Sequence, residues 1–290
     1  MARTPLVSER IGQFFLGEDR LEYTEFGSGD RWVVLVHGQL MLRRMCQPLA
    51  RALAAEGMHV VTIDLLGHGR SDRPADPMVY SMTAFGEQVV ALLDHLGADE
   101  AVIGGTSLGA NVSLEVAATA PDRVRGLLVE MPVLDNAVEV GLVVFGPAML
   151  GARFLPFTVT TARALTRWVP RGLVPFWIGV GLDTCDQQPA AMAAVLHGIV
   201  FGRIAPPSKL RRAIDVPTLV VGHPADPIHP AADAAMLAEE VPGARFVRAE
   251  SIFEWRLRPE RLDAAAIDFV QECWQLRDRP AEGAREAKER

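Results

Sequence analysis

A serine between glycines stands where this sequence could place a nucleophile. The segment GGTSLGAN, residues 104–111, follows the apolar run EAVI and precedes VSLEVAATA, in which the apolar residues have helical spacing. The pattern Gly105-x-Ser107-x-Gly109 is typical of a nucleophile elbow, a sharp strand-to-helix turn that lifts a serine hydroxyl clear of a sheet. Larger side chains would collide in so sharp a turn, which explains the glycines. We therefore interpret Ser107 as a nucleophile.

A second segment could stabilise negative charge beside this serine. His37-Gly38-Gln39-Leu40 follows the apolar run WVVLV, which predicts a strand buried on both faces. The backbone N–H of Gln39, or that of Leu40, could pair with the N–H of Leu108 as a two-donor oxyanion hole. Removal of one such donor typically raises the barrier by roughly 3 to 4 kcal/mol. An ordinary glycine turn is the alternative interpretation.

The elements that must position these residues alternate between short apolar runs and longer helical patterns. This alternation is typical of an α/β fold with a parallel sheet. The predicted strands comprise residues 20–27, 32–38, 59–65, 101–104, 125–131, 216–223 and 244–250, and the predicted helices comprise residues 41–57, 82–97, 108–120 and 259–274.

The alternation stops between the predicted strands at residues 125–131 and 216–223. Residues 135–207 are apolar, rich in Gly and Pro, and helical in pattern, with no clear strand. We interpret them as a helical cap, which suits a hydrophobic substrate; packing among the cap helices alone is the other interpretation. The predicted core then comprises residues 1–134 and 208–276, and residues 277–290 form a charged tail that we expect to be disordered.

Length and composition limit the classes of function. A chain of 290 residues, 49% of them hydrophobic, can bury one sizeable core. The net charge of −7 argues against a nucleic-acid surface, which needs clustered positive charge. Cys46, Cys185 and Cys273 have neither metal-ligand spacing nor an obvious disulfide pattern, which favours a reducing compartment.

Targeting signals are not recognised in the sequence. The N-terminus has no apolar segment typical of a signal peptide, and the longest apolar run, residues 140–152, is too short to span a bilayer. We predict a cytoplasmic protein without a transmembrane segment that binds a small apolar substrate or ligand. We expect no nucleic acid, metal or organic cofactor, and the sequence is compatible with a homo-oligomer.

Four segments together resemble the α/β-hydrolase superfamily, in its capped branch of small esterases and carbon–carbon bond hydrolases. They are HGQL (37–40), DLLGHGRSDRP (64–74), GGTSLGAN (104–111) and VVGHPADPIHP (220–230), and they follow the family's order along most of the chain. The resemblance implies a mostly parallel eight-stranded sheet flanked by helices, with a helical cap after strand six. It also implies that Ser107 is the nucleophile, followed by an acid and later by a histidine.

Asp226 matches the acid of this family. It follows the seventh strand of the family's fold, and Pro230 stands four residues later, as in the family's motif. A carboxylate at this position orients the base and stabilises it once it is charged. A solvated loop aspartate is the alternative. The GHGRSD segment is usually structural in such proteins, so the resemblance assigns His68 and Asp72 to the shaping of a loop.

The sequence departs from the family at the histidine. In such proteins the base follows the last strand, shortly before a Pro-Glu pair that opens the final helix. Here Ile252 occupies that position, and no histidine follows His229 anywhere in the chain. A serine hydroxyl is a poor nucleophile until a neighbour removes its proton. Because loss of the histidine from a serine protease costs about 10⁶-fold in turnover, an ordinary mechanism requires a different base.

His229 is the best candidate for the base. It lies three residues after Asp226, on a loop that should open at the carboxyl edge of the sheet, where sites in such folds form. The alternatives are an ordinary loop histidine and a residue that contacts the substrate. The less favoured bases are histidines elsewhere in the chain and two carboxylates beside Ile252: His37, His59, His95, His197, His223, Glu250 and Glu254.

Three functions remain open from the sequence. The favoured one is a serine-dependent hydrolase of a small apolar ester or related acyl substrate, with Ser107, Asp226 and His229 as catalytic residues and the Gln39 and Leu108 amides as the oxyanion hole. A ligand-binding pseudo-hydrolase would keep the pocket and the cap without turnover. A lyase or cyclase would use the oxyanion hole to polarise a carbonyl. The fold alone does not separate these functions.

Overall fold

One mixed sheet forms the centre of the protein. The computed structural model describes residues 7–134 and 138–278, and its eight strands have the order β1-β2-β4-β3-β5-β6-β7-β8. The β1–β2 and β2–β4 pairs are antiparallel and all other pairs are parallel, so the predicted α/β-hydrolase sheet is confirmed. The strands are β1 (Glu9–Leu16), β2 (Asp19–Phe26), β3 (Trp32–Val36), β4 (His59–Asp64), β5 (Ala101–Thr106), β6 (Val124–Glu130), β7 (Thr218–Gly222) and β8 (Arg245–Arg248).

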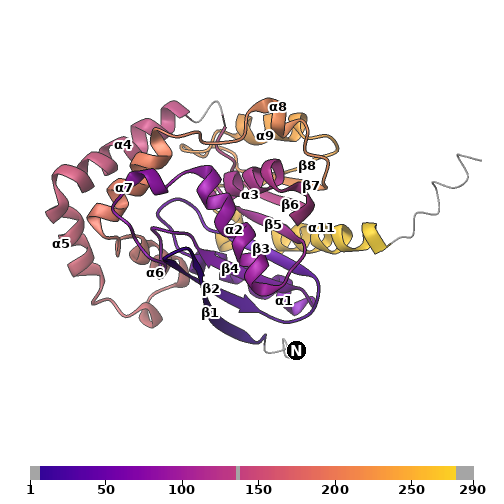
Figure 1. The fold of residues 1–290 in the computed structure, drawn as a ribbon, viewed down its shortest axis with the longest axis horizontal. Helices are drawn as coiled ribbons and strands as arrows, with labels where there is room; N and C mark the ends of the chain where they lie inside the picture. Colours follow the sequence, from indigo (N-terminus) through magenta and orange to yellow (C-terminus); the bar gives the residue numbers. More distant parts are fainter. Residues whose placement is uncertain (1–6, 135–137, 279–290) are drawn as a thin grey trace, which may run out of the picture.

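The central strands are uninterrupted apolar runs because helices cover both faces of the sheet. Every residue of β6 and β7 is buried. One hydrophobic core lies between the sheet and α2 (Met82–Leu96), α3 (Leu108–Thr119) and α9 (Ala231–Glu240). A second core lies between the opposite face and α1 (Gln47–Ala55) and α11 (Glu260–Asp278). Figure 1 shows α2 and α3 in front of the strands, with α11 behind them.

The sequence predicted seven of the strands and missed the first one. β1 is an edge strand in which only Phe14 is buried, so it lacks the apolar run by which strands are recognised. The predicted helix over residues 41–57 begins instead with a 3₁₀ turn, Arg43–Cys46, and α1 follows with Pro48 in its first turn. The predicted helices also did not include α9, which lies directly after the Asp226 loop.

Between β6 and β7 the described residues form helices and no strand. These are α4 (Val138–Phe154), α5 (Pro156–Thr166), α6 (Phe176–Thr184), α7 (Pro189–Val200), α8 (Ser208–Arg211) and the 3₁₀ turn Arg171–Leu173. The chain thus has the predicted helical insertion after the sixth strand, and Figure 1 shows α4–α7 gathered on one side of the sheet. Of the predicted tail, residues 279–290 lie outside the described part, whereas 277 and 278 belong to α11.

A buried side chain of α3 holds both ends of this insertion. The Asn111 side-chain amide donates to Val133 O (2.7 Å) and to Ile204 O (2.8 Å), and it accepts from Val133 N (3.0 Å). Val133 precedes the insertion and Ile204 follows its last long helix. The helix that begins at the serine therefore also fixes where the insertion leaves the sheet and where it returns. None of the helices described here is long and apolar enough to cross a membrane.

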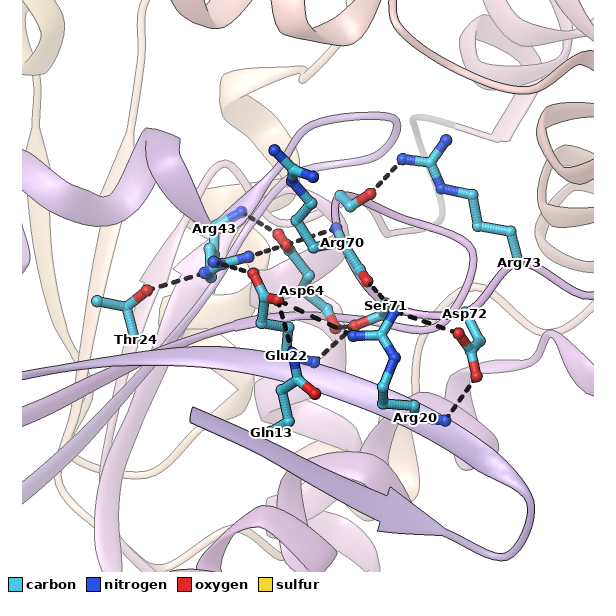
Figure 2. A network of polar contacts seen from close by, with 11 residues as sticks. Gln13, Arg20, Glu22, Thr24, Arg43, Asp64, Arg70, Ser71, Asp72 and Arg73 are labelled. Atoms are coloured by element: carbon cyan, nitrogen blue, oxygen red, sulfur yellow. Dashed lines mark hydrogen bonds and ion pairs between the residues drawn. The ribbon is translucent and has the colours of Figure 1, made fainter. Parts of the chain in front are cut away.

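A polar network braces the loop after β4, as Figure 2 shows. The buried Asp64 carboxylate accepts from the Arg43 and Arg70 N–H groups (2.7 and 2.9 Å) and from the Arg43 guanidinium. A Cβ on Gly69 would lie 2.1 Å from this carboxylate, so only glycine fits there. Asp72 accepts from Arg20 N (2.9 Å), which supports the expectation that this segment shapes a loop.

This network predicts a large stability loss for Asp64→Ala. The variant leaves the nearly buried Arg43 guanidinium without one of its two carboxylate partners, and removal of one member of a buried ion pair costs about 3 to 5 kcal/mol. The matched control is Asp94→Ala, since Asp94 pairs with Arg123 at the surface and such pairs contribute about 1 kcal/mol or less. Urea unfolding measures both changes, and equal losses would contradict the assignment.

Candidate active site

Residues with strained, positive-φ backbone conformations lie at the carboxyl edge of the sheet. Among the described residues other than glycine, positive φ angles occur at Leu40, Ser107, Met131 and Ala225. These four residues follow β3, β5, β6 and β7, which are four adjacent strands. Such conformations cost free energy and persist mainly where function requires them. This edge is also where sites form in open α/β sheets.

Ser107 occupies the turn between β5 and α3 with φ 56° and ψ −108°. A Cβ on Gly105 would lie 2.4 Å from Val36 O, and one on Gly109 would lie 2.1 Å from the same oxygen. No larger residue fits at either position, which accounts for the Gly-x-Ser-x-Gly spacing. The Ser107 N–H donates to Glu130 O (2.9 Å), so the neighbouring strand β6 holds the turn in place.

His229 contacts both the serine and the aspartate. Its Nε2 lies 2.8 Å from Ser107 Oγ, and its Nδ1 lies 3.1 Å from Asp226 Oδ2. An ionised carboxylate can only accept, so Nδ1 carries the proton and Nε2 is left to accept from the serine hydroxyl. The structure therefore brings Ser107, Asp226 and His229 together in the geometry that a nucleophile, its base and an orienting acid require.

The loop after β7 carries the acid and the histidine together. Asp226 Oδ1 accepts from the N–H groups of Ile228 (2.7 Å) and His229 (2.9 Å). Burial alone would raise the pKa of Asp226, but these bonds and the one from the His229 side chain lower it below its ordinary value. An ionised carboxylate at this position can stabilise a positive charge on His229.

Two backbone N–H groups near the serine are available to an oxyanion. Within the part of the chain that the structure describes, neither Gln39 N nor Leu108 N donates to another residue. Leu108 is the first residue of α3, where N–H groups have no intrahelical partner and the helix dipole favours negative charge. The side-chain amide atoms of Gln39 are also buried and have no hydrogen-bond partner within the described residues, so this amide can serve a bound molecule.

Ser107 opens onto an apolar cavity between the core and the insertion. Gln39 and Ser107 supply its polar groups, and α4 and α7 supply part of its apolar lining. The apolar residues around it are Met82, Leu108, Val133, Phe145, Leu196, Ile199, Val200 and Ile204. A molecule bound there would meet mainly aliphatic side chains and present one polar centre to the serine.

A buried charge network fills the region beside the position of the missing histidine. Ile252 lies in the loop after β8, and the preceding Ser251 O lies 3.0 Å from His223 Nδ1. His223 Nε2 lies 3.0 Å from Glu130 Oε1, and Glu130 Oε2 accepts from Arg256 Nη2 (2.7 Å). Both ring nitrogens of His223 are engaged by these oxygens, so neither is left to take a proton from Ser107.

The other candidate bases of the sequence lie in structural contacts. His37 Nε2 accepts from Leu65 N (3.1 Å) and its Nδ1 lies 2.8 Å from Gly38 O, so the ring braces the oxyanion loop. Within the described residues, none of the remaining candidates contacts Ser107. Three of them are histidines with other partners: His59 contacts Glu25, His95 contacts Tyr23, and His197 contacts Phe201. Of the two carboxylates, Glu254 accepts from Arg261 and from the Glu250 N–H.

Sequence reasoning missed Glu130, Arg256 and Thr106. Glu130 is the last residue of the fully buried strand β6, and a carboxylate at the carboxyl end of a buried strand was the signal that could have identified it. Thr106 Oγ1 donates to Glu130 Oε2 (2.5 Å), which links the network to the residue directly before the nucleophile. No local sequence pattern indicated that Arg256 would pair with the buried Glu130. The two residues are 126 positions apart, and their contact depends on how the segment after β8 folds over β6.

Comparisons with known proteins agree with this fold. A family model described as alpha/beta hydrolase fold matches residues 31–155. The 3-oxoadipate enol-lactonase 2 of Acinetobacter baylyi is 26% identical over 226 residues, which are 76% of this chain and 81% of that protein. The structure of the enol-lactonase from Burkholderia xenovorans LB400 is similar with a TM-score of 0.73 and 21% identity, over 90% of this chain and 100% of that one.

A carbon–carbon bond hydrolase has a similar structure. The 2-hydroxy-6-oxo-6-phenylhexa-2,4-dienoate hydrolase from Rhodococcus sp. strain RHA1 gives a TM-score of 0.74 at 20% identity, over 91% of this chain and 99% of that one. The chain thus shares its fold with the enol-lactonase and with this hydrolase.

The buried network predicts a pH-dependent effect of Glu130→Gln on stability. Burial alone would raise the pKa of Glu130, but Arg256 and His223 outweigh it and lower the pKa from 4.5 to about 2. Because the folded-state pKa is the lower one, the stabilisation is complete above pH 4.5 and is lost as the pH falls toward 2. This pKa shift corresponds to a contribution of Glu130 ionisation to the free energy of unfolding of about 3 kcal/mol at pH 7 and about 1 kcal/mol at pH 3.

Urea unfolding at pH 7, 5 and 3 measures this stability difference between the wild type and Glu130→Gln. The control is Glu18→Gln, which changes an exposed carboxylate. The difference for Glu130→Gln should shrink below pH 5, while that for the control stays small throughout. A large difference that is constant from pH 7 to pH 3 would show that the charge of Glu130 is not what stabilises the fold.

Proposed function

Because this chain belongs to the α/β-hydrolase superfamily, we propose that it is a serine-dependent hydrolase whose base is His229. The observation that carries the proposal is the pair of contacts that His229 makes, 2.8 Å to Ser107 Oγ and 3.1 Å to Asp226 Oδ2. The base comes from the loop after β7 instead of the loop after β8. The order nucleophile, acid, histidine along the chain is nevertheless the order usual for this fold.

The geometry supports an acyl-enzyme mechanism. His229 Nε2 takes the Ser107 proton as Oγ attacks the carbonyl carbon, and Asp226 stabilises the imidazolium that forms. The Gln39 and Leu108 N–H groups receive the negative charge of the tetrahedral intermediate. His229 then gives the proton to the leaving oxygen, and the ester bond breaks. Water, deprotonated by the same nitrogen, releases the acid and restores Ser107.

The substrate class that we propose is a small apolar ester, cyclic esters included. The cavity at Ser107 has a mainly aliphatic lining, which favours an apolar acyl or alcohol group. The buried Gln39 amide, which no group in the described part of the chain pairs with, supports one polar group in the substrate. Two of the similar proteins named above are enol-lactonases, which supports hydrolysis of an ester bond. Residues 135–207 act as the cap, since α4 and α7 line this cavity.

Labelling with a fluorophosphonate, read by intact mass, tests this proposal. The wild type should gain one adduct and Ser107→Ala none. His229→Ala should label at least about 10³-fold more slowly, because the serine loses its base. The matched control is His95→Ala, which removes a histidine that contacts Tyr23. Failure of the wild type to label would indicate a pseudo-hydrolase or a non-hydrolytic lyase or cyclase, and normal labelling of His229→Ala would exclude His229 as the base.

A second variant examines the position of the missing histidine. Ile252→His places an imidazole after β8, where the family has its base. With His229 already in contact with Ser107, this variant should label no faster than the wild type. Fluorophosphonate labelling rates of the two proteins decide the matter. A large increase would mean that Ser107 is not activated in the wild type and that the chain descends from an ordinary triad.

A further inference from the structure

Helix α5 has no buried residue, although it carries Phe157, Val159 and Leu165. An eleven-residue helix is marginal in water by itself, since helices of this length gain stability mainly when an apolar face packs against something. Within the described chain it packs mainly against α4 and α7, while Arg163 and Thr166 contact Asp186 and Arg171. Most residues of the helix are nevertheless exposed.

Exposed apolar side chains extend from α5 into the segments on both sides of it. Phe154, Trp168 and Leu173 are 72%, 75% and 82% exposed. Together with Leu155, Phe157 and Leu165, which are also exposed, and with the exposed arginines Arg153 and Arg167, they make up what we call the cap face. Figure 1 shows α5 on the side of the molecule away from the sheet. Soluble monomers rarely expose so many large apolar side chains in one region unless that region binds a partner.

The charge of this region identifies the partner. Residues 140–182 contain four arginines and no acidic residue, in a chain whose net charge is −7. Arg163 and Arg171 pair with aspartates that follow this segment. Arg153 and Arg167 are exposed, and no carboxylate in the described residues pairs with either; the Arg167 guanidinium lies 5.0 Å from the Trp168 ring centre.

We propose that the cap face docks on an anionic lipid surface. Apolar and aromatic side chains beside arginines are the combination by which helices lie in a membrane interface. Each arginine near an anionic surface adds about 1 kcal/mol of attraction. None of the described helices can span a bilayer, so docking is interfacial. If two copies of the cap face met in a dimer, their arginines would lie close together. Residues 140–182 have no acidic side chain to pair with them, so the charges disfavour such a dimer.

Docking of the cap face would place the catalytic cavity near an apolar phase. Helix α4 ends at Phe154 in the cap face, and it also carries Phe145, which lines the cavity at Ser107. The same helix therefore connects the lipid contact to the substrate site. Lipid binding itself needs no reaction at Ser107, so Ser107→Ala should bind as the wild type does.

Flotation of the full chain with vesicles tests this proposal. Wild type should float with phosphatidylcholine–phosphatidylglycerol vesicles and much less with phosphatidylcholine alone. Trp168→Ser combined with Phe157→Ser should weaken binding about tenfold or more, because two apolar anchors are lost. Arg153→Gln combined with Arg167→Gln should also weaken it and reduce its salt dependence.

The matched control removes exposed apolar residues elsewhere. Ile11→Ser combined with Phe15→Ser changes two side chains of β1 that are about as exposed as the cap face and lie outside it. This control should float as the wild type does. The proposal is overturned if the wild type does not float, or if the control loses as much binding as the cap-face variant. It is also overturned if sedimentation shows a dimer that Trp168→Ser dissociates, since a second copy then covers the face.

Discussion

The hydrogen bond between Ser107 and His229 joins the turn after β5 to the loop after β7, and the sheet determines where both segments lie. The two residues are 122 positions apart, and they meet because β5, β6 and β7 are adjacent parallel strands whose carboxyl ends share one edge. Packing at Val36 O allows only glycine on either side of the serine turn. The Asp226 carboxylate holds the histidine loop through two backbone N–H groups and the imidazole. Close packing of the sheet thus determines where the proposed chemistry takes place.

Where the family resemblance predicts a histidine after β8, this chain has Ile252, and a structural polar network lies beside it. Glu130 and His223, which are buried at the ends of β6 and β7, form a polar network with Arg256 of α10 (Glu254–Leu257), the short helix beyond β8. Buried charges of this kind are destabilising unless they are fully paired. Because Thr106 also donates to Glu130, the network supports the turn that holds Ser107. The region in which the family resemblance predicts a base therefore holds a structural network in this chain.

The sequence predicted the fold well because apolar periodicity and glycine spacing are local signals. The helical insertion after β6 and the eight-stranded sheet, which the family resemblance implied, are confirmed, whereas the apolar pattern alone missed the edge strand β1 because it buries one side chain. The pairing of Ser107 with Asp226 followed from the family's motifs, and the position of His229 followed from its closeness to Asp226 in the chain. The Glu130 network depends on contacts across the sheet and could not be predicted. The catalytic role of His229 stays a prediction.

The central claim is that the imidazole of His229 activates Ser107, and chemical rescue tests it most directly. His229→Gly leaves a space where free imidazole can bind beside Ser107 Oγ, at the position that lies 2.8 Å away in the wild type. Added imidazole should restore fluorophosphonate labelling of His229→Gly in a saturable manner, and it should not accelerate labelling of Ile252→Gly. Absence of rescue in His229→Gly, or equal rescue in both variants, would contradict the claim.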